Sequence, residues 1–156
     1  MNKRNSIYLG VLILLFLVAF LVFIEQKKES QLGFENISVQ EAKELIEKGN
    51  VFVLDVRTPA EFNQSHIEGA ILIPVSNAFG SNLSPDNLLK ARTNEVPKNK
   101  KVLVYCRTGR RSIEASTVLA NAGYHVYNME GGIGSWIDAG YPVVSSEARE
   151  TDGSSD

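Results

Sequence analysis

The chain has 156 residues, of which 44% are hydrophobic and 22% are charged, and its formal net charge at pH 7 is -2. This length and composition suit one compact domain, and the near-neutral charge argues against a nucleic-acid-binding protein and against an acidic tail protein. The single cysteine excludes an intramolecular disulfide framework and a cysteine-rich structural zinc site. The two histidines match no metal-ligand spacing, so we expect no metal.

Residues 7–24 form an uninterrupted run without a charged side chain. As a helix, this run would be about 27 Å long at about 1.5 Å per residue, close to the roughly 30 Å of a bilayer's hydrocarbon core. Bulky or charged residues follow the run, so an uncleaved signal-anchor over residues 1–29, with a transmembrane helix at about 7–24, is favoured over a cleaved signal peptide.

The orientation of this expected anchor rests on its flanking charges. Basic residues lie on both sides of the run in nearly equal number, so the positive-inside rule is close to a tie. A short amino-terminal tail usually stays in the cytoplasm. We therefore expect a single-pass membrane protein whose domain is extracytoplasmic, in the periplasm or on the outer face.

Helices alternate with short apolar runs along the rest of the chain. After a polar connector over 27–36, Ser38 and Glu41 form a capping box that opens a helix ended by Gly49. Pro59 suits the first turn of another short helix. Further helices are predicted over 84–92, over 112–123 and after the glycines that begin at 131, and strands over 51–56, 70–75, 101–106 and 125–130.

The predicted strands are nearly continuous apolar runs and do not alternate with period two. Such runs are typical of a mostly parallel sheet that is covered on both faces by helices, which is an α/β fold. We expect this domain over residues 30–145, and a disordered polar tail over 146–156.

Cys106 ends a predicted buried strand, and three arginines follow it closely. In open parallel sheets, ligands bind beyond the carboxyl ends of strands. A tight loop of backbone N–H groups, a helix N-terminus that we place at Ser112 and neighbouring arginines all favour a thiolate over a thiol. Gly109 permits the backbone angles that such a loop needs. The sequence therefore predicts a nucleophilic cysteine that acts on a small anion.

Three motifs in this order make the sequence resemble a rhodanese-homology domain, the sulfurtransferase fold. They are "DVRTPAEFNQSHIEGAILIP" at 55–74, "CRTGRRS" at 106–112 and "GGIGSWIDAGYPV" at 131–143. Ser65 stands where the family pattern has glycine. The resemblance covers about residues 35–145. It adds to the expected fold: an α/β, rhodanese-like parallel sheet flanked by helices on both faces and preceded by one N-terminal transmembrane helix.

The resemblance implies a sulfurtransferase without a metal or an organic cofactor. Cys106 would take a sulfane sulfur from an anionic donor such as thiosulfate, hold it as a persulfide and pass it to cyanide, a thiol or a protein partner. Asp55 and Arg57 lie at the end of the predicted strand over 51–56, so they could support the rim of the site or form a structural ion pair, and we favour structural support for Asp55. The expected substrate-binding residues are Arg107, Thr108, Gly109, Arg110, Arg111 and Ser112, whose hydroxyl could also donate to the sulfur.

Two rival functions stay open at this point. Cysteine-dependent phosphatases use C-x5-R, whereas this loop is C-x4-R from Cys106 to Arg111, one residue short, so phosphatase or arsenate reductase chemistry is disfavoured. A non-enzymatic sulfur relay or protein-binding module is the stronger alternative. His66 invites a Cys–His pair. In the family that the sequence resembles, however, the histidine at this motif position packs and forms hydrogen bonds, and we expect the same of His66. We interpret His125 as an ordinary strand residue.

Overall fold

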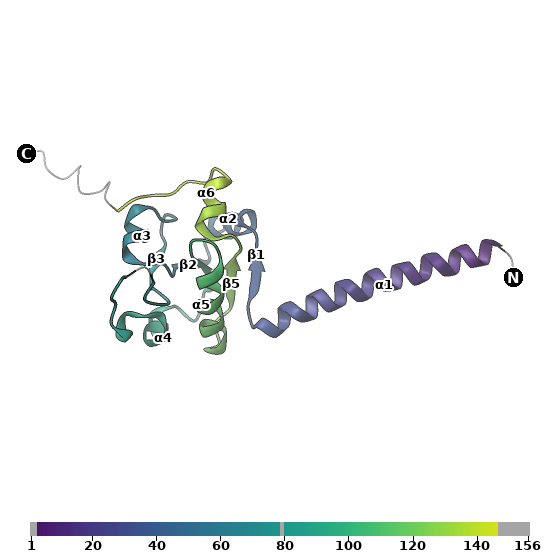
Figure 1. Ribbon diagram of the computed structural model, residues 1–156, viewed down its shortest axis with the longest axis horizontal. Helices are drawn as coiled ribbons and strands as arrows, with labels where there is room; N and C mark the ends of the chain where they lie inside the picture. Colours follow the sequence, from purple (N-terminus) through teal and green to yellow (C-terminus); the bar gives the residue numbers. More distant parts are fainter. Residues whose placement is uncertain (1–2, 79, 147–156) are drawn as a thin grey trace, which may run out of the picture. The chain divides into compact units, whose positions relative to one another are not determined.

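The computed structural model describes residues 3–78 and 80–146, and the chain divides into two units, Met1–Leu32 and Gly33–Asp156 (Figure 1). The first unit contains one helix, α1 (Lys3–Leu32), whose side chains at residues 11–24 are exposed. The prediction of a polar connector over 27–36 is wrong, because α1 continues to Leu32 and a strand begins at Glu35.

No helix within residues 3–78 and 80–146 has both the length and the apolarity needed to cross a membrane. The transmembrane helix expected over 7–24 is thus not supported. The membrane placement and the extracytoplasmic location stay predictions. The disordered tail is expected over 146–156, and residues 147–156 lie outside the described residues.

The second unit is built on a five-stranded sheet in which every pair of neighbouring strands is parallel, as the apolar runs predict. The strand order is β1-β5-β4-β2-β3. The strands are β1 (Glu35–Ile37), β2 (Val51–Asp55), β3 (Ile71–Leu72), β4 (Lys101–Tyr105) and β5 (Val126–Met129). Strand β1 was not predicted, since its three residues lie at the sheet edge, are at most half-buried and form no apolar run.

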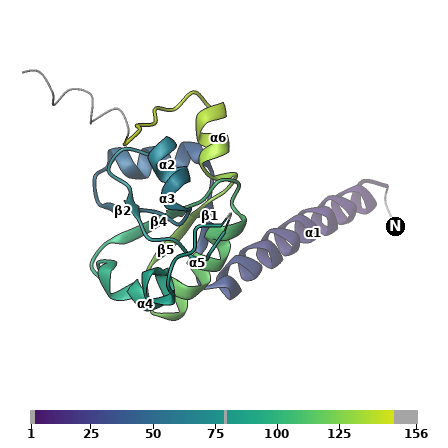
Figure 2. The same ribbon diagram turned by 60° about the vertical axis from the view of Figure 1, so that its left-hand side comes forward.

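Helices cover both faces of this sheet, so this part of the fold prediction is confirmed (Figures 1 and 2). Successive residues of β4 alternate between two hydrophobic cores, because neighbouring side chains in a strand point to opposite faces. One core packs against α4 (Leu89–Arg92) and α5 (Arg110–Asn121). The other packs against α2 (Val39–Glu47), α3 (Pro59–Gln64) and α6 (Gly132–Asp138).

Two helices begin with the same capping arrangement. Ser38 caps α2 together with Glu41, as predicted, and Thr58 caps α3 together with Glu61. In each box the hydroxyl accepts from the glutamate's backbone N–H, and the carboxylate accepts from the backbone N–H of the capping residue. The second box fixes Glu61 in the first turn of α3, beyond the carboxyl end of β2.

The helix predicted over 84–92 is wrong in its continuity. Leu88 has an extended backbone and separates η1 (Pro85–Asn87) from α4, and η2 (Thr93–Glu95) follows. The break lets the backbone N–H of Leu89 donate to the carbonyl of Pro74 while its side chain is fully buried. Tertiary packing thus overrides the local helix preference.

The carboxyl ends of β2 and β4 lie side by side, since Asp55 pairs with Tyr105 in the register. The chain leaves β2 into α3 on one face of the sheet and leaves β4 into α5 on the other face. Open parallel sheets bind ligands beyond the carboxyl ends of strands whose connections leave on opposite faces. Cys106 is the residue directly after β4.

Candidate active site

Cys106 lies at the base of a short loop and is 1% exposed. The backbone N–H of Gly109 donates to its Sγ over 3.2 Å. Gly109 has φ +98 and is the N-cap of α5, a left-handed conformation that glycine adopts without strain. Helix α5 therefore begins at Arg110 and not at Ser112, so the predicted helix start is wrong by two residues. The helix N-terminus is accordingly directed at the sulfur.

The Ser112 hydroxyl has a different partner from the expected one. It is fully buried in the first turn of α5 and donates to the carbonyl of Gly109 over 2.9 Å. This bond fixes the same residue whose N–H meets the sulfur. Ser112 thus holds the loop, and its expected contact with a bound sulfur stays a prediction.

The N-terminus of α6 supports the loop from behind. The N–H of Ile133 donates to the carbonyl of Cys106 over 2.8 Å, and the N–H of Gly134 donates to the carbonyl of Arg107 over 3.0 Å. A Cβ on Gly132 would lie 2.3 Å from the Cys106 carbonyl oxygen, and Gly132 has φ +60. Only glycine allows this close approach of the helix to the loop backbone.

Arg111 forms a bidentate ion pair with Glu61, at 2.8 Å from Nη1 to Oε2 and 2.7 Å from Nη2 to Oε1. Burial alone would raise the pKa of Glu61, but hydrogen bonds from Arg111 and from Thr58 outweigh burial and lower this pKa to about 2. The hydrogen bonds with Glu61 raise the pKa of Arg111. The pair joins α3 to the first turn of α5 beside the cysteine.

Asp55 and Arg57 form a second ion pair, which is almost completely buried. Arg57 Nε donates to both carboxylate oxygens of Asp55, at 3.0 and 2.9 Å, and Nη2 donates to Asp55 Oδ2 over 2.6 Å and to the carbonyl of Ser65. The guanidinium also lies over the ring of Tyr105. These contacts tie the end of β2 to the turn after α3, and they fit the structural alternative for both residues.

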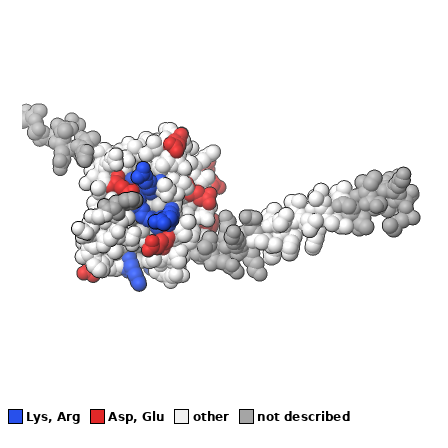
Figure 3. Space-filling model, viewed as in Figure 1, with Lys and Arg blue, Asp and Glu red and all other residues white. Residues whose placement is uncertain are grey.

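A cavity of about 710 Å³ opens over the loop. Arg107, Thr108 and Arg110 line it and are exposed, Arg111 lines it too, and Ser76 and Ala78 form part of its opposite wall. Neither Arg107 nor Arg110 forms an ion pair within the part of the chain that the structure describes. Figure 3 shows basic side chains gathered near the middle of this face of the second unit. The arrangement can attract an anion to the mouth of the cysteine loop.

The two histidines take no part in this loop. The ring of His66 stacks on Phe62 at 3.8 Å, its Nδ1 lies 2.9 Å from the carbonyl of Phe62, and its backbone pairs with Val144. His125 is exposed, and its Nε2 lies 3.4 Å from Glu35. These contacts match the packing role expected for His66.

Sequence reasoning missed two parts of the site. The 55–74 motif contains Glu61 but does not predict its contact with Arg111. Thr58 and Glu61 have the Thr-x-x-Glu spacing of a capping box, and this signal places Glu61 in the first turn of α3. For Gly132 the sequence predicts only a place among the glycines that precede the last helix. Its contact with the loop joins segments that are distant in sequence, and no local signal predicts that contact.

Comparison with known proteins agrees with this geometry. The family model described as "Rhodanese-like domain" matches residues 38–139. A protein named Sulfurtransferase from Allochromatium vinosum is 36% identical over 107 residues, which cover 68% of this chain and 90% of that protein. Thiosulfate sulfurtransferase 16, chloroplastic, of Arabidopsis thaliana is 38% identical over 111 residues, covering 69% and 91%. A rhodanese-related protein from Thermoplasma volcanium has a similar structure, with a TM-score of 0.61 at 34% identity, covering 71% of this chain and 98% of that one.

Proposed function

Because the chain belongs to the rhodanese-like domain family, we propose that it is a sulfurtransferase that carries a sulfane sulfur on Cys106. The donor is a small anion such as thiosulfate, and the acceptor is cyanide or a thiol. The observation that supports this most directly is the N–H of Gly109 on Sγ of the chain's only cysteine, at the N-terminus of α5. Two relatives are themselves named as sulfurtransferases.

In the first step the Cys106 thiolate attacks the outer sulfur of thiosulfate. A bond forms between Sγ and that sulfur, the sulfur–sulfur bond of thiosulfate breaks, and its electron pair leaves with sulfite. The product is a persulfide on Cys106. Arg107 and Arg110 attract the donor, and the backbone N–H groups from Arg107 to Ser112, in the loop and the first turn of α5, stabilise the charge on the transferred sulfur.

In the second step the acceptor attacks the outer sulfur of the persulfide. The sulfur–sulfur bond breaks, and its electron pair returns to Cys106 as a thiolate. No external oxidant or reductant is needed, since the sulfur is transferred at constant oxidation level. Arg111 keeps its orientation through Glu61, which holds the guanidinium beside the loop during both steps.

The test is mass spectrometry of the full chain before and after thiosulfate, with Cys106→Ser as the control. We expect Cys106 to gain the mass of one sulfur atom, and cyanide to remove it as thiocyanate, while the serine variant gains nothing. A folded, reduced protein that gains no sulfur would contradict the proposal and would favour the binding-module alternative.

A relay to a dedicated protein acceptor uses the same chemistry, and the large open cavity favours it as the second candidate.

The loop that meets Sγ contains only residues 107–109 before α5 begins. A loop this short suits one sulfur atom better than a phosphate group. Hydrolysis of an aryl phosphate that is lost in Cys106→Ser would instead support phosphatase chemistry.

A further inference from the structure

A second cavity lies next to the cavity over the cysteine loop. The second one has a volume of about 350 Å³. Its lining is mainly apolar and includes Val75, Leu88, Ala91 and Val118, together with the charged residues Asp86, Lys90 and Glu114. Glu114 lines both cavities, and Ser76 in the first cavity is the neighbour of Val75 in the second. The two cavities therefore adjoin, and we refer to them together as the groove.

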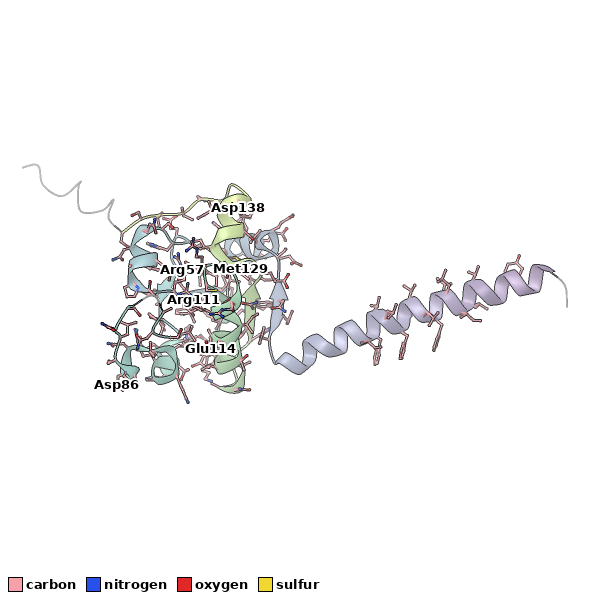
Figure 4. The ribbon with its side chains drawn as sticks, in the orientation of Figure 1. Arg57, Asp86, Arg111, Glu114, Met129 and Asp138 are labelled. Carbon is pink, nitrogen blue, oxygen red and sulfur yellow. The ribbon has the colours of Figure 1, made fainter. Side chains whose placement is uncertain are left out.

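Helix α5 forms the floor of this groove along its length. Arg110 and Arg111 lie at the cysteine end, Glu114 follows one turn later, as Figure 4 shows, and Val118 lies one turn beyond it. At about 1.5 Å per residue, the distance from Arg110 to Val118 along the helix is about 12 Å. The groove thus changes from basic to apolar within three to four residues of an extended peptide, at about 3.3 Å per residue.

The groove is much larger than the proposed sulfur donor. A water molecule takes up about 30 Å³ of liquid, so an anion of a few heavy atoms fills a minor part of the 710 Å³ over the loop. It also makes no use of the apolar second cavity. The second substrate, the sulfur acceptor, is the molecule that these unused surfaces can select.

We propose that the sulfur acceptor is a cysteine-containing segment of a partner protein. An acidic residue next to its cysteine lies against Arg107 and Arg110, and an apolar side chain three or four positions away enters the second cavity. The carboxylate of Glu114 between the two regions disfavours an acidic residue there. This inference rests on the proposed sulfur transfer and names the acceptor of that same site.

The transfer balances without another reactant. The thiolate of the partner's cysteine attacks the outer sulfur of the Cys106 persulfide and forms a new sulfur–sulfur bond. The old bond to Sγ breaks, and its electron pair restores the Cys106 thiolate. The partner leaves with the persulfide.

The experiment loads the full chain with sulfur from thiosulfate and then adds capped hexapeptides that each contain one cysteine. The reference peptide has an aspartate beside the cysteine and a leucine three positions from it, and it is made in both sequence directions. One analogue has lysine in place of the aspartate, and another has serine in place of the leucine. We expect each change to lower the second-order rate constant of sulfur transfer to the peptide about tenfold.

A pair of variants assigns the leucine effect to the second cavity. Ala91→Trp fills the cavity from an exposed position of α4, and Asn94→Trp adds the same side chain at an exposed position that does not line the cavity. We expect Ala91→Trp to abolish the preference for leucine over serine while sulfur loading from thiosulfate is unchanged. Asn94→Trp should retain the preference.

The inference would be overturned, and the proposed function left intact, by normal sulfur loading with equal transfer to all peptides or by a leucine preference that survives Ala91→Trp. Transfer to mercaptoacetate as fast as to the reference peptide would likewise identify a small thiol as the acceptor. Failure of thiosulfate to load Cys106 is a different outcome, because it contradicts the proposed function itself.

Discussion

Helices α5 and α6 begin in the same way but use their N-termini differently. Each follows a neighbouring parallel strand, and each begins at a glycine with positive φ and without a side-chain cap: Gly109 at φ +98 and Gly131 at φ +70. At α5 a backbone N–H meets the sulfur of Cys106. At α6 the first N–H groups are bonded to carbonyls of the cysteine loop.

The difference shows how one structural element serves both reactivity and support. A helix N-terminus has unsatisfied N–H groups and a partial positive charge. Where protein carbonyls accept those hydrogen bonds, as at α6, the helix stabilises the backbone that it contacts. Where a sulfur atom accepts one, as at α5, the same groups can stabilise negative charge that appears during a reaction. Substitutions at each helix should therefore have distinct effects.

The largest effect is expected from Gly132→Ala. A Cβ there lies 2.3 Å from the Cys106 carbonyl oxygen at φ +60, so the left-handed backbone costs about 1–2 kcal/mol and the displacement of the loop about 1–3 kcal/mol more. We expect the free energy of unfolding, measured in urea, to fall by the sum and sulfur transfer to slow.

Gly140→Ala is the matched control for this change. Gly140 also has positive φ, +76, but a Cβ there has nothing within 4 Å. Only the backbone cost of about 1–2 kcal/mol applies, and sulfur transfer should be retained. Equal losses in the two variants would show that the contact between α6 and the loop is unimportant.

A smaller effect is expected from Ser112→Ala at the N-terminus of α5. The change removes the hydrogen bond to the Gly109 carbonyl and should cost about 1–2 kcal/mol of unfolding free energy. Ser116→Ala, four residues later, removes a hydroxyl that is equally buried but has no hydrogen-bond partner among the residues that the structure describes. This control should be neutral or stabilising, and the reverse ranking of the two serines would contradict our account of the loop.

The ion pair of Glu61 with Arg111 predicts a pH dependence of stability. The pKa of Glu61 in the folded state, about 2, lies below its ordinary value of 4.5. As the pH falls, the unfolded chain therefore takes up a proton on Glu61 at a higher pH than the folded chain does. The stabilisation by the ion pair is complete above about pH 4.5 and is lost as the pH falls towards 2. Urea denaturation should show Glu61→Gln less stable than the natural chain at pH 6, with the difference shrinking towards pH 2. A constant difference across this range would exclude the effect.

The smallest effect is expected from removal of residues 1–32. The deletion leaves both helix N-termini intact and retains Phe34, which belongs to the core of the second unit. We expect unchanged rates of sulfur loading and of thiocyanate release. Loss of either activity in a folded protein would show that the first unit contributes to the reaction.

The parallel sheet, its two covered faces and the position of Cys106 could be predicted because each leaves a local pattern. Apolar runs mark the central strands, and Gly109 marks the end of the loop that follows β4. Strand β1 and the break at Leu88 were missed, since both depend on contacts with distant segments: β5 in one case, Pro74 in the other. The helix start was misplaced at Ser112 because serine is a good N-cap, whereas the left-handed Gly109 takes that position.

The pairing of β1 with β5 has a consequence for how the protein is made. Asn36 lies beside Asn128 in the sheet, so the first strand of the domain to leave the ribosome pairs with the last. At about 5–20 residues per second, β1 waits on the order of 5–20 s for its neighbour. During synthesis the edge of β1 that pairs with β5 is consequently open for longer than the pairing edge of any other described strand. An open edge is a site of aggregation.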